Sequence, residues 1–179
     1  MDLENILLAD DIVKSIKENI DYLVEIIPEI KSMFNFPHNN PNHHLDVWNH
    51  TLLALSISDK DFDIRLCLLL HDIGKPHSYQ DDEVRNCRHF WNHPKKSEEI
   101  ARVILKRLGY DEDYINYICY LILHHDEPMT DDDINNNYEL CLKLYRIQIC
   151  DALAHNPNRL GKRLDYLETT KIKLLKKKG

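Results

Sequence analysis

Two side chains that commonly bind metals stand next to each other at the end of an apolar run. His71 and Asp72 follow the apolar stretch 64–70 and precede Gly74 and Pro76, which favour the end of a helix. A buried carboxylate is unfavourable unless it is paired or bound to a metal. The pair is therefore compatible with a metal site or with a core histidine beside a capping aspartate, and partners elsewhere in the chain must decide.

Further ligand-type residues occur in apolar helical patterns. His50 lies among apolar residues, Asp151 shares a helix face with leucine and isoleucine, and His93 stands at a helix start. The doublet His124-His125 ends another apolar pattern. Helical bundles build metal sites from side chains that project inward from facing helices. One shared metal site explains these residues together, and the 11 histidines of the chain support it, because imidazole is the commonest metal ligand.

The elements that must position these residues are predicted to be helices. Apolar residues recur at spacings of 3, 4 and 7, and no segment alternates like a β-strand. We expect a break near Asn19-Ile20, a polar loop over the site at 76–88 and an acidic connection at 129–137. The expected helices span residues 3–27, 29–34, 45–57, 61–73, 94–108, 112–123, 140–154 and 159–177.

The composition indicates an ordinary globular domain. The 179 residues suffice for one domain with a substantial core, and 43% hydrophobic with 30% charged residues is typical of such proteins. No stretch reaches the roughly 18 to 20 apolar residues of a membrane span. The acidic N-terminus lacks the basic start of a signal peptide. We therefore expect a cytoplasmic protein with no membrane partner.

Charge and cysteine usage narrow the possible partners. The formal charge of −7 provides no broad basic surface for nucleic acid. The basic tail at 171–178 is interpreted as a solvated helix end rather than a phosphate-binding patch. The five cysteines are far apart and form no C-x-x-C pair, which argues against a zinc ribbon and against a disulfide framework. Most of them are expected to be buried thiols.

Several segments, read in order, form a family pattern. They are Ile27-Pro28-Glu29-Ile30, Asp46-Val47-Trp48-Asn49-His50-Thr51, His71-Asp72-Ile73-Gly74-Lys75-Pro76, Phe90-Trp91-Asn92-His93-Pro94 and Cys150-Asp151-Ala152-Leu153-Ala154-His155. Over about residues 26–156 the sequence resembles the HD superfamily of metal-dependent phosphohydrolases, whose pattern is H…HD…D. It is most similar to the HD domain carried by some bacterial CCA-adding tRNA nucleotidyltransferases. Nothing resembles the nucleotidyltransferase head, so CCA addition is not predicted.

The resemblance implies a fold and two sets of metal ligands. We expect a single HD domain over residues 1–179, an all-α bundle of about six to eight helices around a metal site, with flanking helices at both ends. The ligands of a first ion would be His50, His71, Asp72 and Asp151. The ligands of a second ion would be His93 and one of His124 and His125, with Asp72 bridging the two ions.

The implied chemistry is metal-dependent hydrolysis of a phosphoester. Nitrogen and oxygen ligands suit Mn, Fe, Co, Ni or Mg, as one or two ions. A divalent ion activates water for attack on phosphorus. Asp72 and Lys75 are the candidate catalytic residues, because Lys75 matches a family lysine that follows the motif and would contact substrate phosphate. Expected substrates are nucleotides, cyclic nucleotides or the 2′,3′-cyclic phosphate ends of RNA.

The chain also departs from the family. Asn92 stands where the family often has glycine, and the acidic segment 131–137 replaces an arginine-containing segment, which removes an expected basic contact to the substrate. His43, His44 and His77 are further candidates for proton transfer, although a surface-loop position explains each of them as well.

Two other functions are compatible with the same ligands. One is a non-catalytic HD module that binds a nucleotide or a partner protein, although such a module would have no need to keep two buried carboxylates. The other is an HD-type oxygenase with a di-iron site, because six ligands in this order occur there too.

Overall fold

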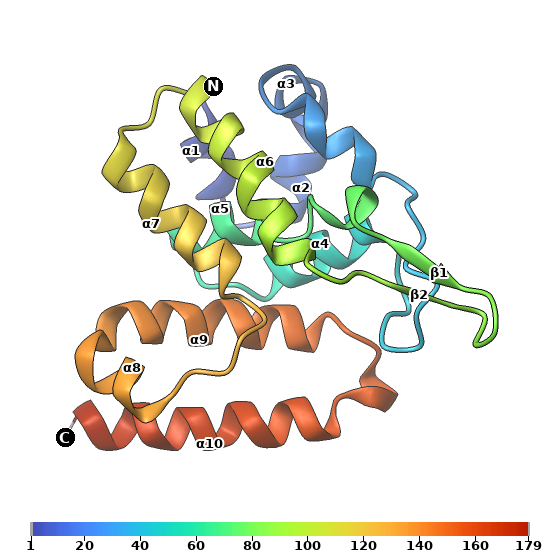
Figure 1. Ribbon diagram of the computed structural model, residues 1–179. Coiled ribbons are helices and arrows are strands. Elements are labelled where there is room, and N and C mark those ends of the chain that lie inside the picture. The colour runs from blue at the N-terminus through green and yellow to red at the C-terminus, as the bar shows by residue number, and fades with distance from the viewer. Residues whose placement is uncertain (1, 179) are drawn as a thin grey trace.

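The computed structural model describes residues 2–178, and they form an all-α fold, as predicted (Figure 1). Ten α-helices lie in this part of the chain, more than the six to eight expected. The excess arises where one predicted helix is divided and where a predicted connection is helical. Among the described residues, no helix combines the length and the apolar character needed to cross a membrane.

The N-terminal segment forms three short helices instead of one long helix. The predicted break at Asn19 is present. A second break precedes Ile12, where the Asp11 carboxylate accepts the N–H of Lys14 at 3.0 Å and so caps a new helix. The elements are α1 (Leu3–Leu7), α2 (Ile12–Glu18), α3 (Ile20–Ile26) and a 3-10 helix at Pro28–Met33.

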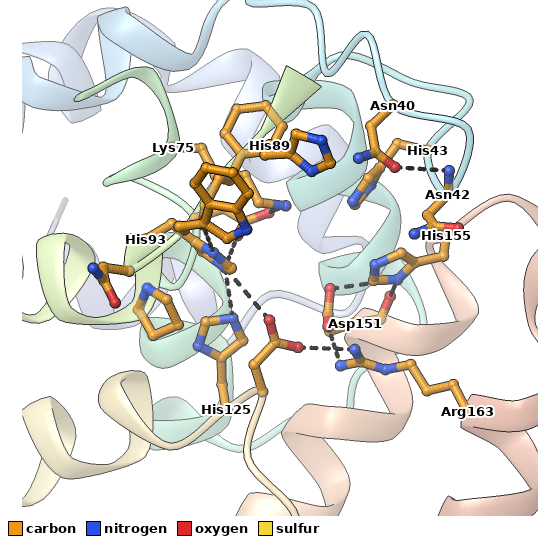
Figure 2. A pocket seen from close by; sticks show the side chains of 16 residues that line it. Asn40, Asn42, His43, Lys75, His89, His93, His125, Asp151, His155 and Arg163 are labelled. Carbon is orange, nitrogen blue, oxygen red and sulfur yellow. Dashed lines mark hydrogen bonds and ion pairs between the residues drawn. The ribbon is translucent and has the colours of Figure 1, made fainter. Parts of the chain in front are cut away.

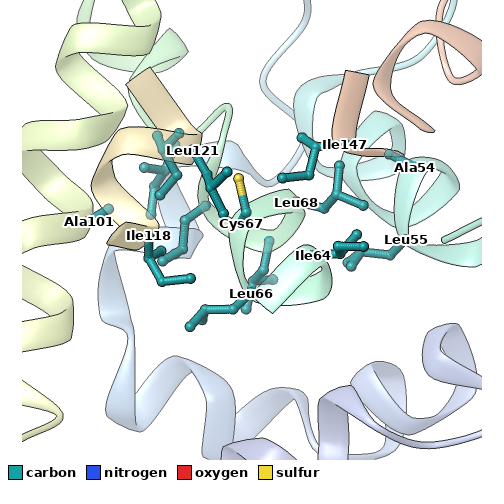
Figure 3. Close-up of a cluster of buried hydrophobic side chains, with 14 of the residues drawn as sticks. Ala54, Leu55, Ile64, Leu66, Cys67, Leu68, Ala101, Ile118, Leu121 and Ile147 are labelled. Atoms are coloured by element: carbon teal, nitrogen blue, oxygen red, sulfur yellow. The ribbon is translucent and has the colours of Figure 1, made fainter. Parts of the chain in front are cut away.

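One helix forms the centre of the core. It is α5 (Phe62–Leu70), in which every residue of 64–70 is buried. Figure 3 shows its side chains enclosed by those of the surrounding helices. A helix whose residues are almost all apolar must be covered by other helices, so its C-terminal end delivers His71 and Asp72 to the interior. The covering helices are α4 (Val47–Ser56), α7 (Glu112–Leu123) and α9 (Tyr138–Leu153).

Helix α6 (His93–Arg107) packs along α7 and approaches the end of α5 closely. The approach occurs at Gly74, where a Cβ atom would lie 2.4 Å from Ser97 N and 2.7 Å from His93 O. The Gly74 N–H donates to Ser97 Oγ at 2.9 Å. The φ angle of Gly74 is −80°, so glycine is needed here for the close contact and not for a left-handed helix end.

The segment predicted as a loop at 76–88 contains a short β-hairpin. A 3-10 helix at Lys75–His77 leads into β1 (Gln80–Asp82) and the antiparallel β2 (Cys87–His89), with Asp82 opposite Cys87. The prediction that no segment is a strand was wrong here. Both strands have three residues and are mostly polar, which is too short to show an apolar alternation.

The C-terminal part is a second layer of helices, orange and red in Figure 1, in which α10 (Gly161–Lys178) runs along α9. The acidic segment predicted as a connection is α8 (Asp131–Asn136). A capping box starts it: Asp133 N–H donates to Thr130 Oγ1, and the Asp133 carboxylate accepts from Thr130 N–H. A 3-10 helix at Pro157–Arg159 joins α9 to α10.

Candidate metal centre

Four predicted ligands from three helices meet beneath the end of α5. The Nε2 atom of His50, on α4, lies 2.9 Å from Asp151 Oδ1, on α9, and 3.5 Å from Asp72 Oδ2. The Nε2 atom of His71 lies 3.3 Å from Asp72 Oδ2 and 3.5 Å from Asp151 Oδ1. All four side chains are buried. The structure therefore brings together two imidazoles and two carboxylates whose sequence positions span about one hundred residues.

A second group shares one of these carboxylates. His93 Nε2, at the start of α6, lies 3.3 Å from Asp72 Oδ1. It also lies 3.3 Å from the Nε2 atom of His125, which follows the end of α7. Figure 2 shows His93 and His125 directed toward each other, with Asp151 on another side of the same space. Asp72 therefore directs Oδ2 toward His50 and His71, and Oδ1 toward His93.

The adjacent histidine of the doublet lies elsewhere. His124 is partly exposed and its Nδ1 atom contacts Glu127. Successive residues of a helical turn point about 100° apart. Only His125 therefore faces His93 and Asp72, and His124 is outside the cluster.

All four clustered imidazoles share one hydrogen-bonding arrangement. Each Nδ1 atom lies 2.6–3.1 Å from a backbone carbonyl oxygen and donates its hydrogen to it. A neutral ring with a hydrogen on Nδ1 has an unprotonated Nε2 atom, which is the form that binds metals. The carbonyl groups belong to Ala154 for His50, Leu68 for His71, Phe90 for His93 and Ile122 for His125.

The residues present fit divalent cations. Within the described chain, His71 Nε2 and Asp72 Oδ1 are buried without a hydrogen-bond partner, while Asp72 Oδ2 pairs with the Lys75 ammonium at 2.7 Å. Buried polar atoms normally have a hydrogen-bond partner. Ligand atoms about 2.1 Å from one ion lie roughly 3.0–3.4 Å apart in octahedral or tetrahedral geometry, and most of the separations given above are close to this range. The unpartnered atoms are therefore placed as metal ligands would be.

The buried carboxylates of the centre are balanced by positive groups around them. Burial opposes the charged form of His71, yet the carboxylates of Asp72 and Asp151 raise the pKa of its imidazole to about 10, so a metal ion would have to replace a proton on this ring. Burial also opposes ionisation of Asp72, but His71 and Lys75 hold the pKa of that carboxyl well below its usual range. Both carboxyls are thus ionised near neutral pH and attract cations.

Lys75 is fixed beside the centre. Its side chain is only 5% exposed, and its Nζ atom lies 2.7 Å from Asp72 Oδ2 and 3.1 Å from His38 Nε2. His38 donates from Nδ1 to the Leu45 carbonyl at 2.7 Å, so its Nε2 atom can accept from Lys75. Burial lowers the pKa of His38 to about 2, which keeps the ring neutral. No motif in the sequence marks His38 for this contact.

Two further residues of the centre were missed. Arg163, on α10, donates from Nη2 to Asp151 Oδ2 at 2.6 Å and from Nη1 to Asp126 Oδ1 at 2.8 Å. Burial opposes ionisation of Asp126, but neighbouring positive charge, including that of Arg163, keeps the pKa of this carboxyl at about 2. Arg163 follows the family motifs by several residues, so the motifs gave no signal for it.

A cavity of about 390 Å³ opens onto the centre. His43 and His155 line it, whereas His44 and His77 are exposed residues outside its lining. Of the three histidines proposed for proton transfer, the structure thus brings only His43 to the cavity. Other lining residues, several of which appear in Figure 2, are Asn40, Asn42, Asp72, Lys75, His89, Phe90, Trp91, His93, His125, Asp126, Asp151 and Arg163.

Asn92, which stands where the family often has glycine, keeps a glycine-like backbone. Its φ angle is +60° and its ψ angle is 18°, in the left-handed region. Asparagine adopts this region more readily than other residues with side chains. The substitution therefore preserves the turn that directs His93 into the cavity.

Comparison with known proteins finds related sequences over most of the chain. Residues 42–169 match the HD domain family. The chain is 29% identical over 121 residues to the CC-adding tRNA nucleotidyltransferase of Thermus thermophilus, covering 64% of this chain and 27% of that protein. It is 29% identical over 123 residues to the A-adding tRNA nucleotidyltransferase of Deinococcus radiodurans, covering 63% and 28%. The chain thus matches less than a third of the length of either relative.

Proposed function

Because the chain belongs to the HD domain family, we propose that it is a metal-dependent phosphohydrolase acting on nucleotides, cyclic nucleotides or the 2′,3′-cyclic phosphate ends of RNA. The observation that carries the proposal is the convergence of imidazole Nε2 atoms and buried carboxylates beside one cavity. Each of the four rings has its Nδ1–H on a backbone carbonyl, which leaves Nε2 directed toward Asp72 or Asp151.

We propose two sets of ligands from this arrangement. His50, His71, Asp72 and Asp151 would hold one ion, and Asp72, His93 and His125 would hold the other. The carboxylate of Asp72 would bridge the ions through its two oxygens. The donor atoms are nitrogen and oxygen, which suit Mn, Fe, Co, Ni or Mg.

The side chains around the ligands would bind and orient a phosphoester. Bound divalent ions supply a water of lowered pKa and neutralise charge on phosphate oxygens. Lys75 and Arg163 bring two further positive charges to the wall of the cavity, and Arg163 provides the basic group that the acidic segment 131–137 lacks. The His43 ring stacks on His38 with centroids 3.7 Å apart, and burial holds its pKa far below the ordinary value, so it would meet the substrate as a neutral hydrogen-bonding group and not as a base.

The proposed substrates are nucleotide-like for two reasons. The cavity has the size of a small-molecule site and combines positive side chains with the aromatic residues Phe90 and Trp91. The relatives are named for adding nucleotides to tRNA, which makes RNA ends a natural class to test.

The proposal includes the domain organisation. Residues 1–179 would form a single HD domain, because one hydrophobic core includes buried side chains from Leu3 in α1 to Leu174 in α10. The N-terminal helices outside the matched segment 42–169 would then be part of the same folding unit.

The test is a metal and substrate screen on the whole chain. The protein is stripped with chelator, reloaded separately with each candidate metal, and assayed against 2′,3′-cyclic nucleotides, nucleoside monophosphates and a chromogenic phosphodiester. We expect phosphoester cleavage that disappears on chelation and returns on reloading. Tight nucleotide binding with no cleavage under any metal would contradict the proposal in favour of a binding module. Oxygen consumption with iron but no phosphoester cleavage would contradict it in favour of an oxygenase.

A further inference from the structure

Three side chains of metal-binding types lie together on the β-hairpin, away from the ligands described above. Asp82 and Cys87 are opposite each other across the two strands, and His89 is two residues beyond Cys87. Residues two apart in a strand point to the same face, and cross-strand partners share that face. The hairpin register therefore places a carboxylate, a thiol and an imidazole on one side.

The distances between these groups are those of a metal site. Cys87 Sγ lies 3.6 Å from His89 Nε2, and His89 Nε2 lies 3.7 Å from Asp82 Oδ2. One ligand atom from each of the three residues lies within 4.8 Å of the other two. Around a tetrahedral zinc ion, with Zn–S about 2.3 Å and Zn–N about 2.05 Å, sulfur and nitrogen would be roughly 3.6 Å apart. The sulfur–nitrogen separation matches this value, and the nitrogen–oxygen separation is a few tenths of an ångström longer.

Local contacts hold two of the three ligands in place. Asp82 Oδ1 accepts the N–H groups of Val84 and Arg85, which leaves Oδ2 directed toward His89, with the exposed Arg85 guanidinium 3.9 Å away. The His89 ring stacks on Trp91 with centroids 4.9 Å apart and an interplanar angle of 7°. The carboxylate and the imidazole are therefore oriented before any ion arrives, which lowers the entropic cost of binding one.

Cys87 differs from the other cysteines of the chain. It is half-buried, whereas Cys67, Cys119, Cys141 and Cys150 are buried. Burial raises the pKa of three of those thiols to values of about 11 or higher, so they resist conversion to the thiolate that binds metals. Cys87 is the thiol in the described chain that has both solvent access and two neighbouring metal ligands.

We propose that Asp82, Cys87 and His89 form a separate binding site for a thiophilic divalent cation such as Zn²⁺. Three protein ligands leave the fourth tetrahedral position open to water or to a ligand. His89 also lines the cavity of the candidate metal centre, so an ion at this site would tie β1 to β2 and fix one wall of that cavity. The thiolate distinguishes this site from the buried centre, whose ligands are nitrogen and oxygen.

Cobalt is the probe that separates the two sites. A Co²⁺ ion bound to a thiolate absorbs in the near ultraviolet by sulfur-to-metal charge transfer, and Co²⁺ bound by nitrogen and oxygen alone does not. We expect this band on titration of the whole protein with Co²⁺, and we expect added Zn²⁺ to remove it by displacement. The band should be absent in Cys87→Ser and should persist in Cys150→Ser, the matched control, and in Asp72→Ala.

A second measurement tests whether His89 and Asp82 also bind the ion. The dissociation constant of Zn²⁺, obtained by competition with Co²⁺, should rise at least about tenfold in His89→Gln and in Asp82→Asn, with circular dichroism confirming that each variant is folded. Absence of the band in the wild-type protein, or its survival in Cys87→Ser, would overturn the proposal. These experiments measure metal binding and not phosphoester hydrolysis, so their result does not depend on the proposed enzyme activity.

Discussion

The Nε2 atoms of His93 and His125 face each other at 3.3 Å, while the Nδ1 atom of each ring donates to a backbone carbonyl. Two unprotonated nitrogens at this distance direct lone pairs at one another, which is unfavourable unless a proton or a cation lies between them. Burial lowers the pKa of His125 to about 4, which disfavours the proton. The geometry therefore favours a cation shared by the two rings and the nearby Asp72.

The histidine doublet gives a prediction with a built-in control. His125→Ala should weaken binding of the second ion by at least about tenfold, because it removes a buried ligand atom. His124→Ala, one residue away and partly exposed, should leave binding nearly unchanged. Isothermal titration with Mn²⁺ measures both, and an equal loss in the two variants would contradict the assignment.

Removal of the Asp72 carboxylate, the proposed bridge, should weaken binding of both ions. In Asp72→Ala neither group keeps its full ligand set, so bound metal and phosphoester cleavage should fall together, the rate by at least about 10²-fold. Asp113→Ala, an exposed acid on α7, is the matched control and should retain both properties. Metal analysis and the hydrolysis assay give the result. Full activity in Asp72→Ala would rule out the proposed mechanism.

Addition of one methyl group at the contact of α6 should disturb the fold and the second ion site together. In Gly74→Ala the new Cβ atom would overlap backbone atoms of Ser97 and His93, which cannot rotate away. We expect a loss of about 1–3 kcal/mol in the free energy of unfolding, measured with urea, and weaker binding of the second ion. Gly161→Ala, where a Cβ meets no atom within 4 Å, should not be destabilising.

Loss of the Arg163 salt bridges should weaken metal binding, because Arg163 orients the ligand Asp151. Arg163→Met leaves Asp151 Oδ2 and Asp126 Oδ1 without their guanidinium partner, so the carboxylate ligand loses its fixed orientation. Metal affinity should fall by about 10- to 100-fold, with partial recovery in Arg163→Lys. The exposed Arg159→Met, on the preceding 3-10 helix, serves as the control. Unchanged affinity in Arg163→Met would show that Asp151 is positioned by other contacts.

A cluster of Lys143, Asp61, Asp63 and Tyr114 connects three helices and should make the free energy of unfolding depend on pH. Lys143, on α9, contacts Asp61 and Asp63 of the α5 start, and Tyr114 of α7 donates to Asp63 at 2.7 Å. Burial opposes ionisation of Asp61, but the Ile64 N–H and Lys143 lower its pKa below the usual 3.8. A lowered pKa contributes stability above pH 3.8, and this contribution is lost as pH falls through the folded-state value.

Lys143→Met should therefore be less stable than the wild type by about 1 kcal/mol at pH 7, a modest value because these groups are partly solvated. The difference should shrink as pH falls from 3.8 through the lower folded-state pKa of Asp61, because the protonated carboxyl no longer pairs with Lys143. Urea unfolding at several pH values measures it. Lys96→Met, which removes an exposed pair with Glu99, should show little change at any pH. A constant difference for Lys143→Met at every pH would contradict the linkage.

Local signals in the sequence determined most of the helices and the ligand types. The apolar residues Ile64 and 66–70 predicted a buried helix, because a segment apolar on nearly every side is stable only inside the molecule. The same run fixed the place of His71 and Asp72 at its inner end. Proline and glycine marked the helix ends on either side of α6, because their backbone restrictions act locally.

Tertiary packing decided what these local signals left open. Residues of the doublet 124–125 have the same type, and only the direction in which α7 ends selects His125 over His124. Arg163 and His38 come from segments with no motif, and they reach the centre because α10 runs along α9 and the loop before α4 folds over Lys75. Such contacts join residues far apart in the chain, so no local pattern encodes them, and only the packed helices bring the charges within bonding distance.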